Sequence, residues 1–131
     1  MTESYSLTDL VEAAAQVREQ AYAKFSDYKV GAALLAEDGT IFSGCNVENS
    51  SFGLTICAER SAVTAAVSAG RQNFQALALV SSQHGAPCGA CRQVLAEFCG
   101  DDFPIHVAAA EDLEDIKTST LGDLLPDAFR F

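Results

Sequence analysis

The sequence predicts an α/β fold, in which helices pack on a sheet with at least some parallel strand pairing. Apolar strand-like runs alternate along the chain with helix-like stretches, which is the pattern of βα units. About half of the 131 residues are hydrophobic (49%), which is enough to bury a core without disulfide support. This length suits a single domain over residues 1–131, and we find no repeats, linkers or low-complexity stretches.

The first elements are a helix and a β-hairpin. Ser6 can cap a helix whose apolar residues recur at helical spacing: Leu7, Leu10, Val11, Ala14, Val17 and Ala21. An apolar run at 30–36 and a second one at 41–42 flank Asp38-Gly39, a dipeptide typical of hairpin turns. We therefore expect a helix from residue 7 to about residue 21, followed by two paired strands.

Helices and strands then alternate to the end of the chain. Residues 57–69 form an alanine-rich helix that can pack closely on a sheet, with Thr55 as its expected cap. A buried strand is predicted at 76–80, a loop at 84–87, a helix at 88–98 and another strand at 105–109. A short helix at 121–125 stops before Pro126.

The charge balance narrows the class of partner. Eight Lys and Arg stand against 18 Asp and Glu, which gives a net charge of −10. Such a surface repels phosphate backbones and anionic lipids, so we expect neither a nucleic acid polymer nor a membrane as the main partner. No apolar run approaches the roughly 20 residues of a membrane span, and residues 1–4 lack the features of a signal peptide. We therefore expect a cytoplasmic location.

Five cysteines in a reducing compartment indicate a metal site or catalysis rather than disulfides. Cys88 and Cys91 are three residues apart, so they share one face of their predicted helix. Cys57 begins the other helix. A helix N-terminus lowers the pKa of a thiol, and zinc binds the thiolate. Three such ligands on one Zn²⁺ would leave a position for water, as in catalytic zinc sites.

The two residues next to this expected site suit catalysis. Glu59 follows Cys57 by two positions, so it is badly placed to bind the same ion but stays close to it. That placement is what a general base acting on zinc-bound water requires. Arg60 can share the face of Cys57, where its guanidinium would donate to a thiolate and restore some Lewis acidity to a zinc ion bound by three anions.

These stretches resemble a known family. The motifs are Cys57-Ala58-Glu59-Arg60 and 87–93 (Pro-Cys-Gly-Ala-Cys-Arg-Gln), together with segments 30–34, 44–49 and 124–129. In combination they resemble the small, homotetrameric type of zinc-dependent cytidine deaminase. The resemblance implies a three-layer α/β/α sandwich whose mixed sheet has about five strands. It also implies one zinc per subunit and a homotetramer with shared active sites, acting in pyrimidine salvage.

The resemblance further implies a reaction and roles for matching residues. Cytidine and 2′-deoxycytidine would be hydrolysed to uridine, 2′-deoxyuridine and ammonia, with Glu59 shuttling protons while a zinc-bound hydroxide attacks C4. Substrate-binding positions would be Asn46 and Glu48 at the ribose hydroxyls, the Ala58 N–H at the pyrimidine O2, Tyr28 beside the substrate and Phe129 in a neighbouring subunit's site. Tyr28 stands where the family usually has Phe, and Lys24-Phe25 stands where many members have Pro-Tyr.

Other interpretations of the same residues stay open at this point. Within the same chemistry, the substrate could be a modified cytosine nucleoside or the antibiotic blasticidin S. Outside it, the chain could be a zinc-stabilised binding module with a fourth ligand from His84, Cys45 or Cys99. Cys88 and Cys91 could also form a redox pair, although that hypothesis leaves Cys57-Ala58-Glu59 without a role.

Overall fold

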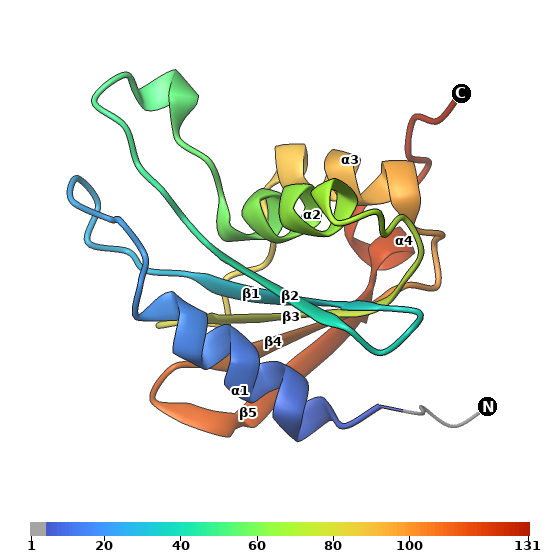
Figure 1. The fold of residues 1–131 in the computed structure, drawn as a ribbon, viewed down its shortest axis with the longest axis horizontal. Helices are drawn as coiled ribbons and strands as arrows, with labels where there is room; N and C mark the ends of the chain where they lie inside the picture. The colour runs from blue at the N-terminus through green and yellow to red at the C-terminus, as the bar shows by residue number, and fades with distance from the viewer. Residues whose placement is uncertain (1–4) are drawn as a thin grey trace.

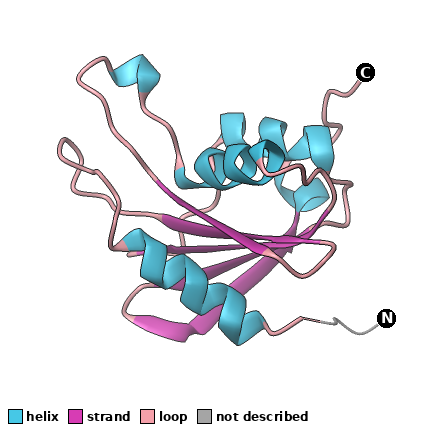
Figure 2. Ribbon diagram, viewed as in Figure 1, coloured by secondary structure: helices cyan, strands magenta, loops and turns pink. Residues whose placement is uncertain are grey.

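Five strands form one sheet in the order β2-β1-β3-β4-β5 in the computed structural model, which describes residues 5–131 (Figures 1 and 2). The expectation about a signal peptide falls on residues 1–4, outside the described residues. The strands are β1 (Gly31–Ala36), β2 (Ile41–Cys45), β3 (Phe74–Ser81), β4 (Pro104–Ala109) and β5 (Asp112–Thr120). A mixed α/β sheet of this size confirms the predicted fold class.

Strand pairing in this sheet is mostly antiparallel. β1 pairs antiparallel with both β2 and β3, and β4 pairs antiparallel with β5. The β3–β4 pair is parallel, with Leu77 opposite Ile105, and α3 lies in the connection between these two strands. The tight turn between β1 and β2 contains Gly39 at φ +91°, a conformation that glycine adopts without steric cost.

Helices cover both faces of the sheet, which gives three layers (Figure 1). On one face α1 (Leu7–Arg18) packs through Leu10, Val11 and Ala14. On the other face lie α2 (Ala58–Ser68), α3 (Gly89–Phe98) and the short α4 (Leu121–Leu124). The strands between the layers supply fully buried residues to both faces, because successive side chains of a strand point to opposite sides.

Two sequence expectations are wrong, and one strand has no counterpart among the predicted elements. The first helix ends at Arg18 rather than near residue 21, because the amides of residues 19–21 bond three residues back in tighter turns. Thr55 does not cap α2: it ends a single 3₁₀ turn, Phe52–Leu54, and Cys57 occupies the N-cap position. β5 was not assigned from the sequence, because its nine residues are mostly polar and exposed.

Candidate metal centre and active site

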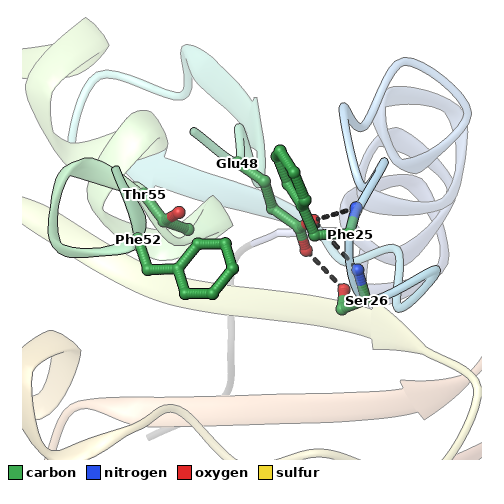
Figure 3. Close-up of a pocket in the computed structure, with 5 residues that line it drawn as sticks. All are labelled: Phe25, Ser26, Glu48, Phe52 and Thr55. Atoms are coloured by element: carbon green, nitrogen blue, oxygen red, sulfur yellow. Dashed lines mark hydrogen bonds between the residues drawn. The ribbon is translucent and has the colours of Figure 1, made fainter. Parts of the chain in front are cut away.

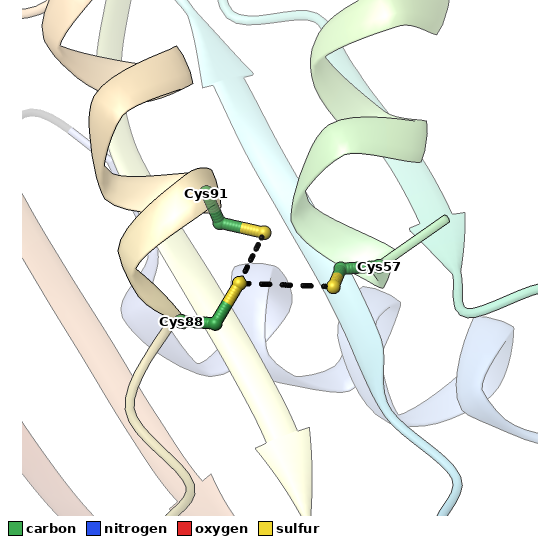
Figure 4. A group of neighbouring side chains, drawn as sticks. All are labelled: Cys57, Cys88 and Cys91. Carbon is green, nitrogen blue, oxygen red and sulfur yellow. Dashed lines mark hydrogen bonds between the residues drawn. The ribbon is translucent and has the colours of Figure 1, made fainter. Parts of the chain in front are cut away.

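The N-termini of α2 and α3 bring three cysteines together. Cys57 is the N-cap residue of α2, Cys88 is the N-cap residue of α3, and Cys91 lies in the first turn of α3. The Cys88 sulfur lies 3.5 Å from that of Cys91 and 3.9 Å from that of Cys57 (Figure 4). Neither N-cap cysteine uses its side chain to cap its helix, so both thiols remain available to a metal ion.

This sulfur cluster fits a zinc ion. Tetrahedral coordination with Zn–S bonds of about 2.3 Å places two sulfurs roughly 3.8 Å apart, close to the two distances observed here. Among residues 5–131, no His, Asp, Glu or further Cys joins the group of ligand atoms that lie within 4.8 Å of one another. His84 instead bonds Asp115, through the backbone oxygen at 2.9 Å and the carboxylate at 3.3 Å. The described residues thus bring together three sulfur atoms that could bind one metal ion, and no fourth side chain of these types joins them.

Positive charge lies beside the thiols. The Arg60 Nη2 donates to the Cys57 sulfur at 3.6 Å and to the Thr55 carbonyl at 3.4 Å. A hydrogen bond from the Cys91 thiol and the Arg60 guanidinium lower the pKa of Cys57. The hydrogen bond to Cys57 and burial raise the pKa of Cys91. Of these two cysteines, Cys57 is therefore the one that more readily becomes a thiolate.

Glu59 lies beside the sulfur cluster without joining it. The first turn of α2 carries this residue, which is only 6% exposed. Burial is the main cause that raises the pKa of its carboxyl group, and the nearby charge of Cys57 raises it further. A buried carboxyl with a raised pKa keeps its proton to a higher pH than an exposed carboxyl does, which suits a general acid–base group.

Two adjoining cavities give access to this centre. The inner one has a volume of about 270 Å³, and its lining includes Cys57, Cys88, Glu59, Ala58, Asn46 and Tyr28. The outer one, of about 370 Å³, is lined by Phe25, Ser26, Glu48, Phe52 and Thr55 (Figure 3). Ser26, Glu48 and Thr55 line both cavities. Ser26, Phe52, Gly85 and Ala86 also line these cavities, although no motif in the sequence points to them.

Asn46 and Glu48 line the inner cavity, and their side chains also hydrogen-bond to the backbone of the segments around it. The Asn46 side chain accepts from the Val30 N–H and donates to the Tyr28 carbonyl, each at 2.9 Å. The Glu48 carboxylate accepts from the Phe25 N–H at 2.8 Å, and from the N–H at 3.1 Å and the hydroxyl of Ser26. These bonds lower the pKa of Glu48, with the Ser26 hydroxyl as the largest cause. The hydrogen-bond partners of Asn46 and Glu48 lie 16 to 23 residues away, so no local sequence pattern indicates that these side chains stabilise the cavity wall.

Phe129 lines neither of these two cavities. Its side chain is 67% exposed, and it packs edge-on against Phe131 with ring centroids 5.2 Å apart. The Gln93 side chain donates to the Phe129 carbonyl at 2.8 Å, which fixes the C-terminal segment on α3. The remaining cysteines stay apart from the centre: Cys99 is buried, and burial raises its pKa to about 12.

Comparisons with known proteins identify relatives over most of the chain. The family model described as "Cytidine and deoxycytidylate deaminase zinc-binding region" matches residues 4–107. A cytidine deaminase of Sporosarcina psychrophila is 51% identical over 122 residues, which cover 92% of this chain and 88% of that protein. One from Halalkalibacterium halodurans is 46% identical over 122 residues, covering 92% and 91% of the two chains.

Solved structures agree with these sequence relatives. The crystal structure of a cytidine deaminase from Burkholderia pseudomallei has a TM-score of 0.89 at 47% identity, covering 95% of this chain and all of the other. That of a cytidine deaminase from Mycobacterium tuberculosis has a TM-score of 0.83 at 41% identity, covering 98% and 100% of the two chains. Both share the overall fold that carries the sulfur cluster.

Proposed function

Because the chain belongs to the cytidine and deoxycytidylate deaminase family, we propose that it hydrolyses cytidine and 2′-deoxycytidine to the uridine nucleosides and ammonia. The observation that carries this proposal is one cavity lined by Cys57, Cys88 and the buried Glu59, with the sulfur of Cys91 within 4.8 Å of the other two sulfurs. A binding module has no need of Glu59 at that place, since burying an ionisable group without an equivalent gain costs stability.

Zinc is the cofactor, and Cys57, Cys88 and Cys91 are the side chains that would hold it. When bound, zinc supplies a Lewis acid and a water of lowered pKa. Arg60 donates to the Cys57 sulfur and so offsets part of the negative charge of three thiolates.

Glu59 would move the protons. Its carboxylate takes a proton from the attacking water and delivers it to N3 of the pyrimidine. It then takes the remaining proton of that water, which is now the hydroxyl proton on C4, and passes it to the C4 amino group. The C4–N bond breaks as the C4=O bond forms, and ammonia leaves. The raised pKa of Glu59 supports this role, because a group that both accepts and donates works best with a pKa nearer the working pH.

The cavity wall would orient the nucleoside. Asn46 and Glu48 would bind the ribose hydroxyls through the donor and acceptor positions that their bonds to neighbouring backbone groups and to Ser26 do not use. Ala58 is the first residue of α2, where a helical N–H has no partner within the helix, and it would donate to the pyrimidine O2. Tyr28 lines the same space and would pack beside the base. The Glu48 carboxylate repels a 5′-phosphate, so we expect an unphosphorylated substrate.

We also propose that the chain works as a homotetramer in the cytoplasm. Large apolar side chains are exposed around the outer cavity and at the C-terminus: Tyr22, Phe25, Val47, Phe52, Leu54, Phe129 and Phe131. Such patches favour association with further copies, and Phe129 would then complete a neighbour's site.

The five cysteines are free, which suits a reducing compartment. No helix in residues 5–131 has both the length and the hydropathy to cross a membrane. Residues 1–131 would form one catalytic domain, because the buried apolar residues on both faces pack against the same sheet.

A substrate panel with a matched variant tests this function. Ultraviolet absorbance would follow turnover of cytidine, 2′-deoxycytidine, deoxycytidylate and blasticidin S, with zinc content measured in parallel. We expect turnover of the first two by the wild type. We expect Glu59→Gln to keep zinc and lose turnover by several orders of magnitude. If Glu59→Gln retains zinc and keeps the wild-type rate, the proposed role of Glu59 is refuted. If the wild type turns over blasticidin S alone, that antibiotic and not cytidine is the substrate.

A further inference from the structure

Arg92 lies one residue after the metal-ligand candidate Cys91 and points its guanidinium group at two backbone carbonyls. Its Nε donates to the Pro87 carbonyl at 2.6 Å, and its Nη1 donates to the Leu124 carbonyl at 2.6 Å. Pro87 directly precedes Cys88, and Leu124 is the last residue of α4. One side chain therefore ties the segment that enters α3 to the C-terminal part of the fold.

Cys88 has the least support from packing of the three sulfur residues. It is exposed, whereas Cys57 is half-buried and Cys91 is buried inside the first turn of α3. Cys88 also precedes the helical residues and follows a loop. The position of its sulfur thus depends on how firmly the chain is held at residue 87.

The hydrogen bond from Arg92 to the Pro87 carbonyl restrains the chain at residue 87. The Pro87 carbonyl and the Cys88 Cα belong to one planar peptide unit, so a bond that restrains the carbonyl oxygen also restrains the Cys88 Cα. Both bonds come from a charged donor and are short, as charge-assisted bonds are. Guanidinium is planar with several fixed N–H directions, so it can reach two carbonyls where lysine has a single ammonium group.

We propose that Arg92 is a positioning residue for the metal centre. It holds the backbone at Cys88 against the end of α4 and thereby slows the release of zinc. The proposal rests on the proposed function only in taking Cys57, Cys88 and Cys91 as the zinc ligands. It assigns Arg92 no contact with substrate and no proton transfer.

Arg130 provides a matched control at the other end of α3. Its Nε donates to the Ala96 carbonyl at 3.0 Å, and its Nη2 donates to the Cys99 carbonyl at 3.1 Å and to Asp101 at 3.2 Å. Like Arg92, it ties two backbone carbonyls with one guanidinium group. Its contacts lie at the C-terminal end of the helix, away from the sulfur cluster.

The experiment measures zinc release from the full-length protein into a chromogenic chelator, for the wild type, Arg92→Gln, Arg92→Lys and Arg130→Gln. Melting temperatures of the same proteins are measured with and without zinc. We expect release to be at least tenfold faster from Arg92→Gln, intermediate from Arg92→Lys, and within twofold of the wild type from Arg130→Gln, although both glutamine variants melt earlier. If Arg92→Gln does not fold, Arg92→Lys carries the test.

Two results would overturn the proposal: release from the Arg92 variants at the wild-type rate, or equal acceleration in Arg130→Gln. Wild-type protein that binds no zinc would instead refute the ligand assignment, so the two failures are distinguishable.

Discussion

Gly44 in β2 lies directly against the backbone of Ala62 in α2. A methyl group placed on Gly44 would come within 2.4 Å of the Ala62 amide nitrogen and 2.8 Å of the Ala58 carbonyl oxygen. Backbone atoms of a helix have little room to move, so the helix as a whole would have to shift. The lack of a side chain at Gly44 thus sets the distance between α2 and the sheet. This distance in turn sets the position of Cys57 and Glu59 at the start of that helix.

Substituting Gly44 should therefore damage both stability and the metal centre. We expect Gly44→Ala to lower the free energy of unfolding by about 2–3 kcal/mol, in the upper part of the range for overpacked sites, and to weaken zinc binding. Urea unfolding with and without zinc would measure both effects. Gly53→Ala is the control, because a Cβ there has no neighbour within 4 Å. Equal stability of the two variants would contradict the packing argument.

Glu48 should contribute to the pH dependence of stability. The Ser26 hydroxyl, with the N–H groups of Phe25 and Ser26, lowers its pKa in the folded protein. A carboxylate with a lowered folded-state pKa stabilises the fold above its unfolded pKa, near 4.5. That contribution is lost as the pH falls from this value through the folded pKa. Glu48→Gln should therefore lose less stability than the wild type between pH 6 and strongly acidic pH.

Melting temperatures across this pH range would measure the effect. Glu12→Gln, which alters an exposed carboxylate on α1, serves as the control and should follow the wild type. If the wild type and Glu48→Gln lose stability in parallel, the hydrogen bonds to Glu48 do not stabilise its charged form.

The sequence was most informative where function depends on short segments. Spacing alone predicted that Cys88 and Cys91 share a helix face and that Glu59 stays beside the ligands, because the geometry of one helical turn is fixed. Most strands were predicted because they are buried and apolar. β5 was missed, since an exposed edge strand such as Asp112–Thr120 needs no apolar pattern and is stabilised by its pairing with β4.

Contacts between distant segments could not be predicted in the same way. The cap of α2 was placed at Thr55 from its residue type, but the chain between β2 and α2 turns once more before the helix begins. The bond from Asn46 to the backbone of Tyr28 and the bond from Arg92 to Leu124 join segments 18 and 32 residues apart. Such pairs arise from the tertiary arrangement, which no local pattern encodes.

Arg60 should tune the reactivity of the centre rather than hold the metal. Because its guanidinium donates to the Cys57 sulfur, Arg60→Ala should make the ligand set more electron-rich while leaving three sulfurs in place. We expect zinc to be retained, kcat to fall by roughly 10–100-fold, and the pH–rate profile to shift to higher pH. Steady-state kinetics from pH 5 to 10, with zinc analysis, would measure this.

Arg71→Ala is a matched control for Arg60→Ala. It removes an arginine whose ion pair with Asp38, at 2.9 Å, lies on the surface between the β1–β2 turn and the end of α2. We expect its profile to match that of the wild type. An unshifted profile in Arg60→Ala would refute the charge-balance argument.

Mixing an inactive variant with one of weakened substrate binding should test whether Phe129 serves a neighbouring subunit. Phe129 is exposed and lines neither of the two cavities beside the metal centre. If it completes a neighbour's site instead, Phe129→Ala should raise KM at least tenfold without loss of zinc. Glu59→Gln should be inactive for lack of its proton carrier. In a mixed assembly, a Phe129→Ala subunit keeps Glu59 and receives Phe129 from a Glu59→Gln neighbour, which restores a complete site. Refolding the two variants together should therefore recover high-affinity turnover that neither variant shows alone. If the mixture shows only the average of its two components, Phe129 does not act across a subunit boundary.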